Sequence, residues 1–181
     1  TAVKDGACWV LNGSKMFITH GTSADTLVIM AVTDKSKGAK GISAFILERG
    51  TSLSQTVGLV AGKKENKLGM RASETTEVIL QNCRVPASQL IGEAGQGFIQ
   101  TLQVLDAGRI GIAALSVGLA QGAYEAAARY TAERKQFGRV IGEFQALQHR
   151  AAHLYGEMEM ARSAVLKAQN FLDEDDPRAE L

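Results

Sequence analysis

The chain of 181 residues has few cysteines, no large excess of either charge and no long apolar run. Cys8 and Cys83 lack a nearby Cys or His partner, which argues against a structural zinc site and fits a reducing compartment. Twenty Lys and Arg against nineteen Asp and Glu give a net charge of +1. No basic excess therefore points to nucleic acid or to anionic lipid. No uninterrupted apolar stretch reaches the length of a membrane span, so we expect neither a nucleic-acid partner nor a membrane partner.

Several motifs of catalysis and binding are also missing. The sequence has no Walker loop, no Gly-x-Gly-x-x-Gly after a strand and no Ser-His-Asp ordering. His149 and His153 lie four residues apart but lack the glutamate of a zinc-binding helix, so we interpret them and His20 as surface residues. Thr1 is not an initiator Met, and no targeting pattern is present. We expect the chain to be an excerpt of a longer protein.

The first half of the chain has the pattern of β structure. Residues 1–90 contain short apolar runs separated by glycines and polar clusters, which predicts a small antiparallel barrel or sandwich. Asn12-Gly13 lies between two such runs and predicts a hairpin with a type I′ turn. Pro86 closes this half. Further strands are expected at 26–32, 42–47 and 77–80, with less distinct ones near Val57 and Leu68.

Residues 91–181 change to a helical period. One apolar stripe runs from Phe98 toward Tyr130, and a second alternates steps of three and four from Phe144 to Leu172. The second stripe is typical of a bundle seam. Two helices cannot bury both stripes, so we expect further helices, another subunit, or both. The predicted fold class is α+β, with the β domain followed by the long helices of an incomplete up-down four-helix bundle.

Four glycines interrupt the first helical stripe, at a cost of about 1 kcal/mol each relative to alanine. They are expected where another helix or a flat ligand approaches the backbone closely, and the residue pattern favours another helix. The four are Gly108, Gly111, Gly118 and Gly122.

The break between the two helices is the strongest candidate for binding chemistry. It contains Arg134-Lys135-Gln136-Phe137-Gly138, and Gln145 follows at the start of the next helix. A guanidinium can grip a phosphate through two hydrogen bonds, and the free N–H groups of a helix N-terminus also favour anions. Cationic residues also end helices simply because they suit the helix dipole. The residue types alone leave both interpretations open.

Two further groups of residues combine with this corner. Phe17 and Thr19 fall on one face of a strand and Ile18 on the other, so a ring and a hydroxyl stand side by side. This suits a planar heteroaromatic ligand, although such alternation is ordinary in strands. Asp106 and Arg109 lie three residues apart on one helical face. An arginine that faces a helical core must be paired. The two residues therefore form either a structural ion pair or a polar anchor at the mouth of a ligand pocket.

Four blocks of residues follow one another along the chain: Trp9–Thr19, Lys67–Arg71, Leu105–Ile110 and Glu133–Gly138. Taken in this order, they resemble the acyl-CoA dehydrogenase family over essentially the whole chain, closest to its short-chain, butyryl-CoA type. The resemblance implies a middle β domain over 1–90 and the first helices of the C-terminal helical domain over 91–181. It also implies FAD as cofactor, an acyl-CoA thioester oxidised at its α,β bond to the 2-enoyl-CoA, and an electron-transfer flavoprotein as electron acceptor. The expected assembly is a homotetramer, a dimer of dimers, in the bacterial cytoplasm or the mitochondrial matrix.

The resemblance implies roles for individual residues. Phe17, Ile18 and Thr19 would contact the flavin, with Phe17 over the ring and Thr19 hydrogen-bonded to its reactive edge. Asp106 and Arg109 would line the acyl-CoA site. Contacts to the adenosine diphosphate part of an FAD held by a neighbouring subunit would come from Arg134, Gln136, Phe137 and Gln145.

The chain also departs from the family pattern. Phe17 stands where the family commonly has Trp, and His20 where Asn is frequent. The family's catalytic base is a glutamate that usually lies beyond the position of Leu181, or in some members just before the arginine of the Asp-x-x-Arg block. Here that position is Gly108, so no catalytic residue is named. Two alternatives stay open: a related acyl-CoA oxidase-type flavoenzyme, and a truncated, non-catalytic, oligomerising paralogue.

Overall fold

The computed structural model describes residues 1–49 and 57–174. The chain divides into two compact units, Thr1–Leu102 and Gln103–Leu181. The division falls inside a helix and does not test the domain boundary predicted near residue 90, which stays a prediction.

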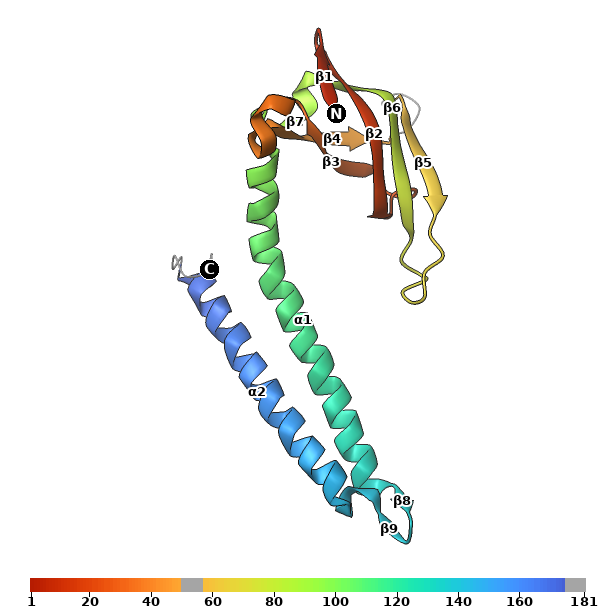
Figure 1. The fold of residues 1–181 in the computed structure, drawn as a ribbon, viewed down its shortest axis with the longest axis vertical. Helices are drawn as coiled ribbons and strands as arrows, with labels where there is room; N and C mark the ends of the chain where they lie inside the picture. Colours follow the sequence, from red (N-terminus) through yellow and green to blue (C-terminus); the bar gives the residue numbers. More distant parts are fainter. Residues whose placement is uncertain (50–56, 175–181) are drawn as a thin grey trace. The chain divides into compact units, whose positions relative to one another are not determined.

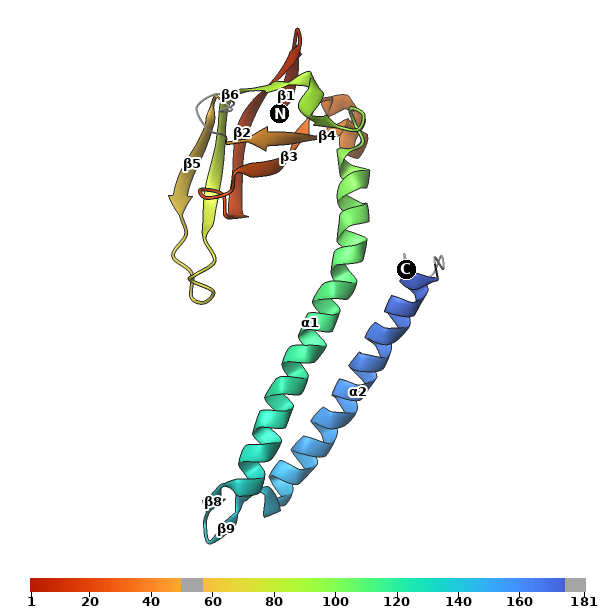
Figure 2. The same cartoon turned by 180° about the vertical axis from the view of Figure 1, so that it is seen from behind.

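The first unit is built from two antiparallel sheets (Figures 1 and 2). In the described residues the strands form no closed barrel, and side chains from both sheets share one core, so the sandwich form of the prediction is confirmed. The four-stranded sheet has the order β1 (Ala2–Asp5), β2 (Cys8–Thr19), β6 (Thr75–Pro86) and β5 (Leu59–Lys64). The three-stranded sheet has the order β3 (Thr26–Val32), β4 (Ile42–Glu48) and β7 (Leu90–Ile91). Two short 3₁₀ segments, η1 (Lys35–Gly41) and η2 (Ala87–Gln89), precede β4 and β7.

Alternation along the strands produces this core. Trp9 and Leu11 of β2 point inward, whereas their neighbours along the strand are more exposed. The rings of Trp9 and Phe45 meet edge to face with centroids 5.6 Å apart, which joins β2 to β4 across the sandwich. The remaining core side chains come from β1, β3, β4 and β6 and include Ala2, Leu27, Ile29, Leu47, Val78, Leu80, Cys83 and Val85.

The predicted hairpin at Asn12-Gly13 is wrong. β2 runs without a turn from Cys8 to Thr19, and the hairpin lies earlier, between β1 and β2 at Gly6-Ala7. Asn12 and Gly13 instead lie at a bulge opposite β6, where the Asn12 carboxamide oxygen accepts the Asn82 N–H at 2.8 Å. Pairing with a strand some seventy residues later therefore overrides the local turn signal.

The other strand predictions have mixed outcomes. The strand expected at 26–32 is confirmed, those at 42–47 and 77–80 are parts of β4 and β6, and Pro86 does end β6. The strand near Val57 begins two residues later, at Leu59. The strand near Leu68 is wrong, because this residue lies in the loop between β5 and β6 with 98% of its side chain exposed.

Two long helices form most of the second unit. α1 (Gly97–Glu133) begins in the first unit, and α2 (Gln145–Asp173) begins one residue after the predicted Phe144. Figures 1 and 2 show them side by side and antiparallel, joined through β8 (Lys135–Gln136), β9 (Arg139–Val140) and η3 (Ile141–Glu143). Between them runs an apolar groove of about 450 Å³, lined by Ala127, Leu147, Ala151, Leu154 and Met158 among others.

These two helices bury little of their apolar surface, as predicted. Met158 is the only buried hydrophobic residue found in the described part of the second unit. Ile112, Leu115 and Leu119 of α1 are 65–75% exposed. A Cβ atom added at Gly108, Gly111, Gly118 or Gly122 would meet nothing within 4 Å, so among the described residues the Cβ side of these four glycines is open.

The length and apolarity of α1 also satisfy a simple criterion for a membrane span, with an 18-residue window of mean hydropathy 1.4. Among the described residues it is the one helix that does so. The core helix of a helical bundle satisfies the same criterion, so this observation is weak evidence for a membrane.

Candidate functional site

The first candidate group lies at the end of β2. The pairing of β2 with β6 shifts register between Lys15 and Ile18, and Phe17 within this bulge has a left-handed backbone with φ of 58°. A non-glycine residue rarely adopts this conformation, and such strain concentrates at functional sites. Phe17 is 68% exposed and Thr19 is also exposed, whereas Ile18 packs against the core. Phe17 and Thr19 are thus both open to solvent, and their position on one face of the strand stays a prediction.

The second group is the predicted pair on α1. Arg109 Nη1 lies 3.4 Å from Asp106 Oδ1, and the side chains are 70% and 42% exposed. The ion pair thus exists, but both partners lie on one helix and remain open to solvent. An exposed pair of this kind contributes little to stability, so its polar groups are available to a ligand or a partner.

The third group is the break between the helices. β8 and β9 pair Gln136 with Arg139, which leaves Phe137 and Gly138 as a two-residue turn. Both turn residues have positive φ, 55° and 78°, as a type I′ turn requires. Glycine suits the second position, but phenylalanine at the first is strained, and its ring is 87% exposed.

The start of α2 lies directly beside this turn. The helix follows Phe144, and no side chain caps its N-terminus. The first N–H groups of a helix have no partner within the helix and carry partial positive charge, so they favour an anion. The Phe144 and Phe137 rings pack edge to face with their centroids 6.1 Å apart, and the guanidinium carbon of Arg139 lies 4.1 Å from the centroid of the Phe144 ring. These contacts hold the turn against the helix start.

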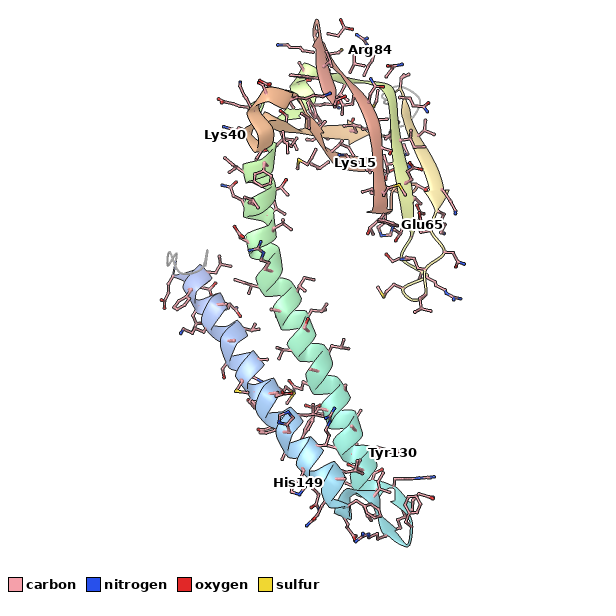
Figure 3. All side chains as sticks on the ribbon, in the orientation of Figure 1. Lys15, Lys40, Glu65, Arg84, Tyr130 and His149 are labelled. Atoms are coloured by element: carbon pink, nitrogen blue, oxygen red, sulfur yellow. The ribbon has the colours of Figure 1, made fainter. Side chains whose placement is uncertain are left out.

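Neither Arg139 nor Phe144 is among the residues predicted to bind a ligand. The sequence feature that could have identified Arg139 is the turn: if Phe137-Gly138 is a two-residue turn, Arg139 must lie opposite Gln136. Arg134, by contrast, makes hydrogen bonds only through its backbone among the described residues, accepting from Ile141 N–H at 2.8 Å and donating to Tyr130 at 2.9 Å. Its exposed guanidinium is thus free for an anion. Figure 3 labels Tyr130 and His149, which lie at this same end of the two helices.

The structure therefore brings some predicted residues together and separates others. Arg134, Gln136 and Phe137 share the hairpin, and Gln145 is the first residue of the adjoining helix. Arg109 is about 36 Å from the end of α1 at a rise of about 1.5 Å per residue. A single phosphate cannot contact both Arg109 and Arg134.

Each of these groups, taken within its own unit, suits a different kind of ligand group. The exposed ring of Phe17 with a hydroxyl two residues on suits a planar aromatic group, and the guanidinium of Arg134 beside an uncapped helix N-terminus suits a phosphate. No group of three or more His, Cys, Asp or Glu residues in the described ranges could hold a metal ion. His149 and His153 are exposed, and His153 contacts Glu157 at 3.2 Å, consistent with the surface role predicted for them.

Comparison with protein families gives two matches in consecutive parts of the chain. Residues 1–83 match the model described as "Acyl-CoA dehydrogenase, middle domain". Residues 95–181 match "Acyl-CoA dehydrogenase, C-terminal domain". Together they leave only residues 84–94 unmatched.

Individual relatives agree with the family models. The short-chain specific acyl-CoA dehydrogenase of Clostridium acetobutylicum is 50% identical over 92% of this chain and 43% of its own length. The solved butyryl-CoA dehydrogenase of Megasphaera elsdenii has a TM-score of 0.88 and 43% identity, over 97% of this chain and 45% of that one. Curated relatives include bacterial proteins and one described as mitochondrial.

A further solved chain is similar to the same extent. It belongs to a structure reported for the electron transferring flavoprotein of Acidaminococcus fermentans and flavin-based electron bifurcation, with a TM-score of 0.88 and 48% identity. The match covers 98% of this chain and 45% of that one. The chain thus spans less than half the length of the proteins to which it is similar.

Proposed function

Because this chain belongs to the acyl-CoA dehydrogenase family, we propose that it forms the middle domain and part of the C-terminal domain of an FAD-dependent enzyme that oxidises an acyl-CoA thioester to its 2-enoyl-CoA. The observation that carries the proposal is the shared state of Phe17 and Phe137, both exposed and both held in a left-handed backbone conformation. Strain of this kind persists only where the surrounding structure enforces it. Both residues lie in the blocks that resemble the family.

The residues of this chain would divide the work of binding. Phe17 and Thr19 would contact the flavin head, and Ile18 would fix them by packing its own side chain into the core. Arg134, Gln136, Phe137 and Gln145 would contact the diphosphate end of an FAD belonging to a neighbouring subunit. Arg109 and Arg134 lie too far apart along α1 to contact one phosphate. This distance supports separate binding sites for the acyl-CoA and for the diphosphate of FAD. FAD, when bound, supplies the acceptor for the β-hydride.

Asp106 and Arg109 would orient the acyl-CoA. Their ion pair at 3.4 Å keeps the guanidinium directed along one face of α1. Removal of the α-proton needs a positioned carboxylate. The position just before Arg109 is Gly108, which has no side chain, so we propose that the base belongs to the part of the family's length that this chain does not span.

The proposed assembly is a homotetramer in the bacterial cytoplasm or the mitochondrial matrix, with an electron-transfer flavoprotein as redox partner. The exposed leucines of α1 and the open space at Gly108, Gly111, Gly118 and Gly122 support helical partners. The similarity to a chain in the Acidaminococcus fermentans structure supports the electron-transfer partner.

An anaerobic reduction experiment tests the proposed function. We expect the full-length protein to be purified with a yellow flavin chromophore that bleaches when butyryl-CoA is added without oxygen. Flavin that no acyl-CoA bleaches would contradict the proposal. Rapid bleaching followed by stoichiometric hydrogen peroxide on admission of air would favour the oxidase alternative, and a colourless protein would favour the non-catalytic paralogue.

A further inference from the structure

The loop that follows the flavin-contact strand is held by hydrogen bonds. After Thr19, residues 20–25 carry the chain from β2 to β3 and so join the two sheets. Gly21 is the only buried residue in this loop. His20 has a left-handed backbone with φ of 54°, and its carbonyl accepts the N–H groups of Ser23 and Ala24 at 3.1 and 2.8 Å. The loop therefore turns sharply at the residue next to Thr19.

Glu74 holds this turn with both its backbone and its side chain. It lies immediately before β6, and its carbonyl accepts the His20 N–H at 3.0 Å. Its carboxylate oxygen Oε1 accepts the Thr22 N–H at 2.8 Å. The hydrogen bond from Thr22 lowers the pKa of the Glu74 carboxyl below its ordinary value of 4.5, so the group is a charged acceptor at neutral pH.

Arg49 holds the same loop from the other sheet. It follows β4, and its two terminal guanidinium nitrogens donate to the carbonyls of Gly21 and Thr22. Its own backbone N–H donates to the Asp25 carbonyl at 2.7 Å. The planar fork of a guanidinium suits two neighbouring oxygens. The loop is thus fixed to β6 of one sheet and β4 of the other.

The loop also packs directly onto the strand pair next to Phe17. A Cβ atom at Gly21 would lie 2.3 Å from Thr76 Oγ1, so only glycine allows this close approach. Thr76 pairs with Ile18, and Thr75 pairs with Thr19. Any outward displacement of the loop therefore moves the residues that follow the bulge at Phe17.

We propose that Glu74 and Arg49 are positioning residues that set the placement of Phe17 and Thr19 toward the flavin head. This inference rests on the proposed function, because it assigns a ligand to that face of β2. Neither side chain needs to touch the cofactor: both act on the backbone of the loop that leaves Thr19. The preorganisation of a contact by a second layer of hydrogen bonds is a general requirement of precise binding sites.

The test compares Glu74→Ala with Glu74→Gln in the full-length protein. Gln keeps an acceptor oxygen for Thr22 N–H, whereas Ala removes it. Glu65→Ala is the matched control, because Glu65 lies at the β5 end of the β5–β6 loop (Figure 3) and its carboxylate makes no hydrogen bond with the residues that the structure describes. The two measurements are amide hydrogen exchange over residues 17–24 and the flavin content and absorption spectrum after purification.

For Glu74→Ala we expect exchange of the Thr22 amide to rise about fivefold or more, with lower flavin content or a shifted flavin band. Glu74→Gln and Glu65→Ala should stay close to wild type in both measurements. If the Thr22 amide of Glu74→Ala exchanges at the wild-type rate, Glu74 does not hold the loop. If exchange is faster but the flavin content and absorption spectrum are unchanged, Glu74 does not position the flavin contacts. A wild-type protein without flavin would instead contradict the proposed function, while the exchange data would still decide whether Glu74 holds the loop.

Discussion

The guanidinium carbon of Arg139 lies 4.1 Å from the centre of the Phe144 ring. The same ring meets Phe137 edge to face, so Phe144 connects the turn and β9 of the hairpin to the start of α2. This contact engages Arg139 with an aromatic face, whereas the guanidinium of Arg134 makes no hydrogen bond or ion pair among the described residues. We therefore propose different roles for the two arginines, packing for Arg139 and phosphate binding for Arg134.

Phe144→Leu is predicted to loosen the hairpin and so weaken FAD retention. It removes the cation–π contact and the edge contact to Phe137, each about 1 kcal/mol at an exposed site. Flavin release during gel filtration and amide exchange over residues 135–140 measure the effect. Arg139→Lys keeps the charge but loses the planar stack, so it should give an intermediate result. Wild-type flavin content in Phe144→Leu would show that the stack is dispensable.

Phe137→Asn is predicted to leave the stability of the flavin-free protein nearly unchanged while lowering flavin content. Asparagine tolerates the left-handed conformation, which relieves about 1 kcal/mol of backbone strain. Loss of the ring contact to Phe144 costs about the same amount. Phe137→Leu is the control, since it keeps the strain and loses the ring, and it should lower the melting temperature. If both variants retain flavin fully, Phe137 does not contact the cofactor.

The helices could be predicted closely from the sequence because their signal is local. The stripe from Phe144 to Leu172 alternates steps of three and four, and α2 runs from Gln145 to Asp173. The corner could be placed for the same reason, since a break between two periodic stripes fixes where the chain must turn.

The strand details could not be predicted, because they depend on residues far away in the sequence. Asn12-Gly13 has the residue types of a hairpin turn and of a bulge alike, and only the pairing with Asn82 decides between them. The left-handed backbone of Phe17 follows from a register shift against β6, which no pattern within β2 reveals. The loop contacts of Glu74 and Arg49 were hidden for the same reason.

Arg109→Met is predicted to impair substrate use and to leave FAD content unchanged. The substitution keeps a long side chain but removes the partner of Asp106 and the charge that would face the acyl-CoA. Since the ion pair is exposed, the melting temperature should change little. Steady-state kinetics with butyryl-CoA should show kcat/KM reduced about tenfold or more, as expected for the loss of a charged hydrogen bond.

Arg134→Ala is the counterpart that separates the two sites. The substitution should lower flavin content, and excess FAD should restore much of the activity of this variant. Excess FAD should not restore the activity of Arg109→Met. Arg129→Ala, at an exposed arginine of α1, controls for the loss of one positive charge near the same corner. The opposite pattern, with flavin lost in Arg109→Met and kept in Arg134→Ala, would exchange the two assignments.

Cys83 is predicted to resist alkylation in the folded protein, whereas Cys8 reacts. Cys83 is fully buried, and burial raises the pKa of its thiol from 9.0 to about 11. Below pH 9 the thiol is neutral in the folded and the unfolded chain, so it does not affect stability. As the pH rises from 9 toward 11 the unfolded chain ionises first, and the folded state loses stability. Mass spectrometry after brief iodoacetamide treatment at pH 8 should find the label on half-buried Cys8 alone, with Cys83 labelled only in denaturant. Equal labelling of both cysteines in the native protein would mean that the β sandwich opens readily around β6.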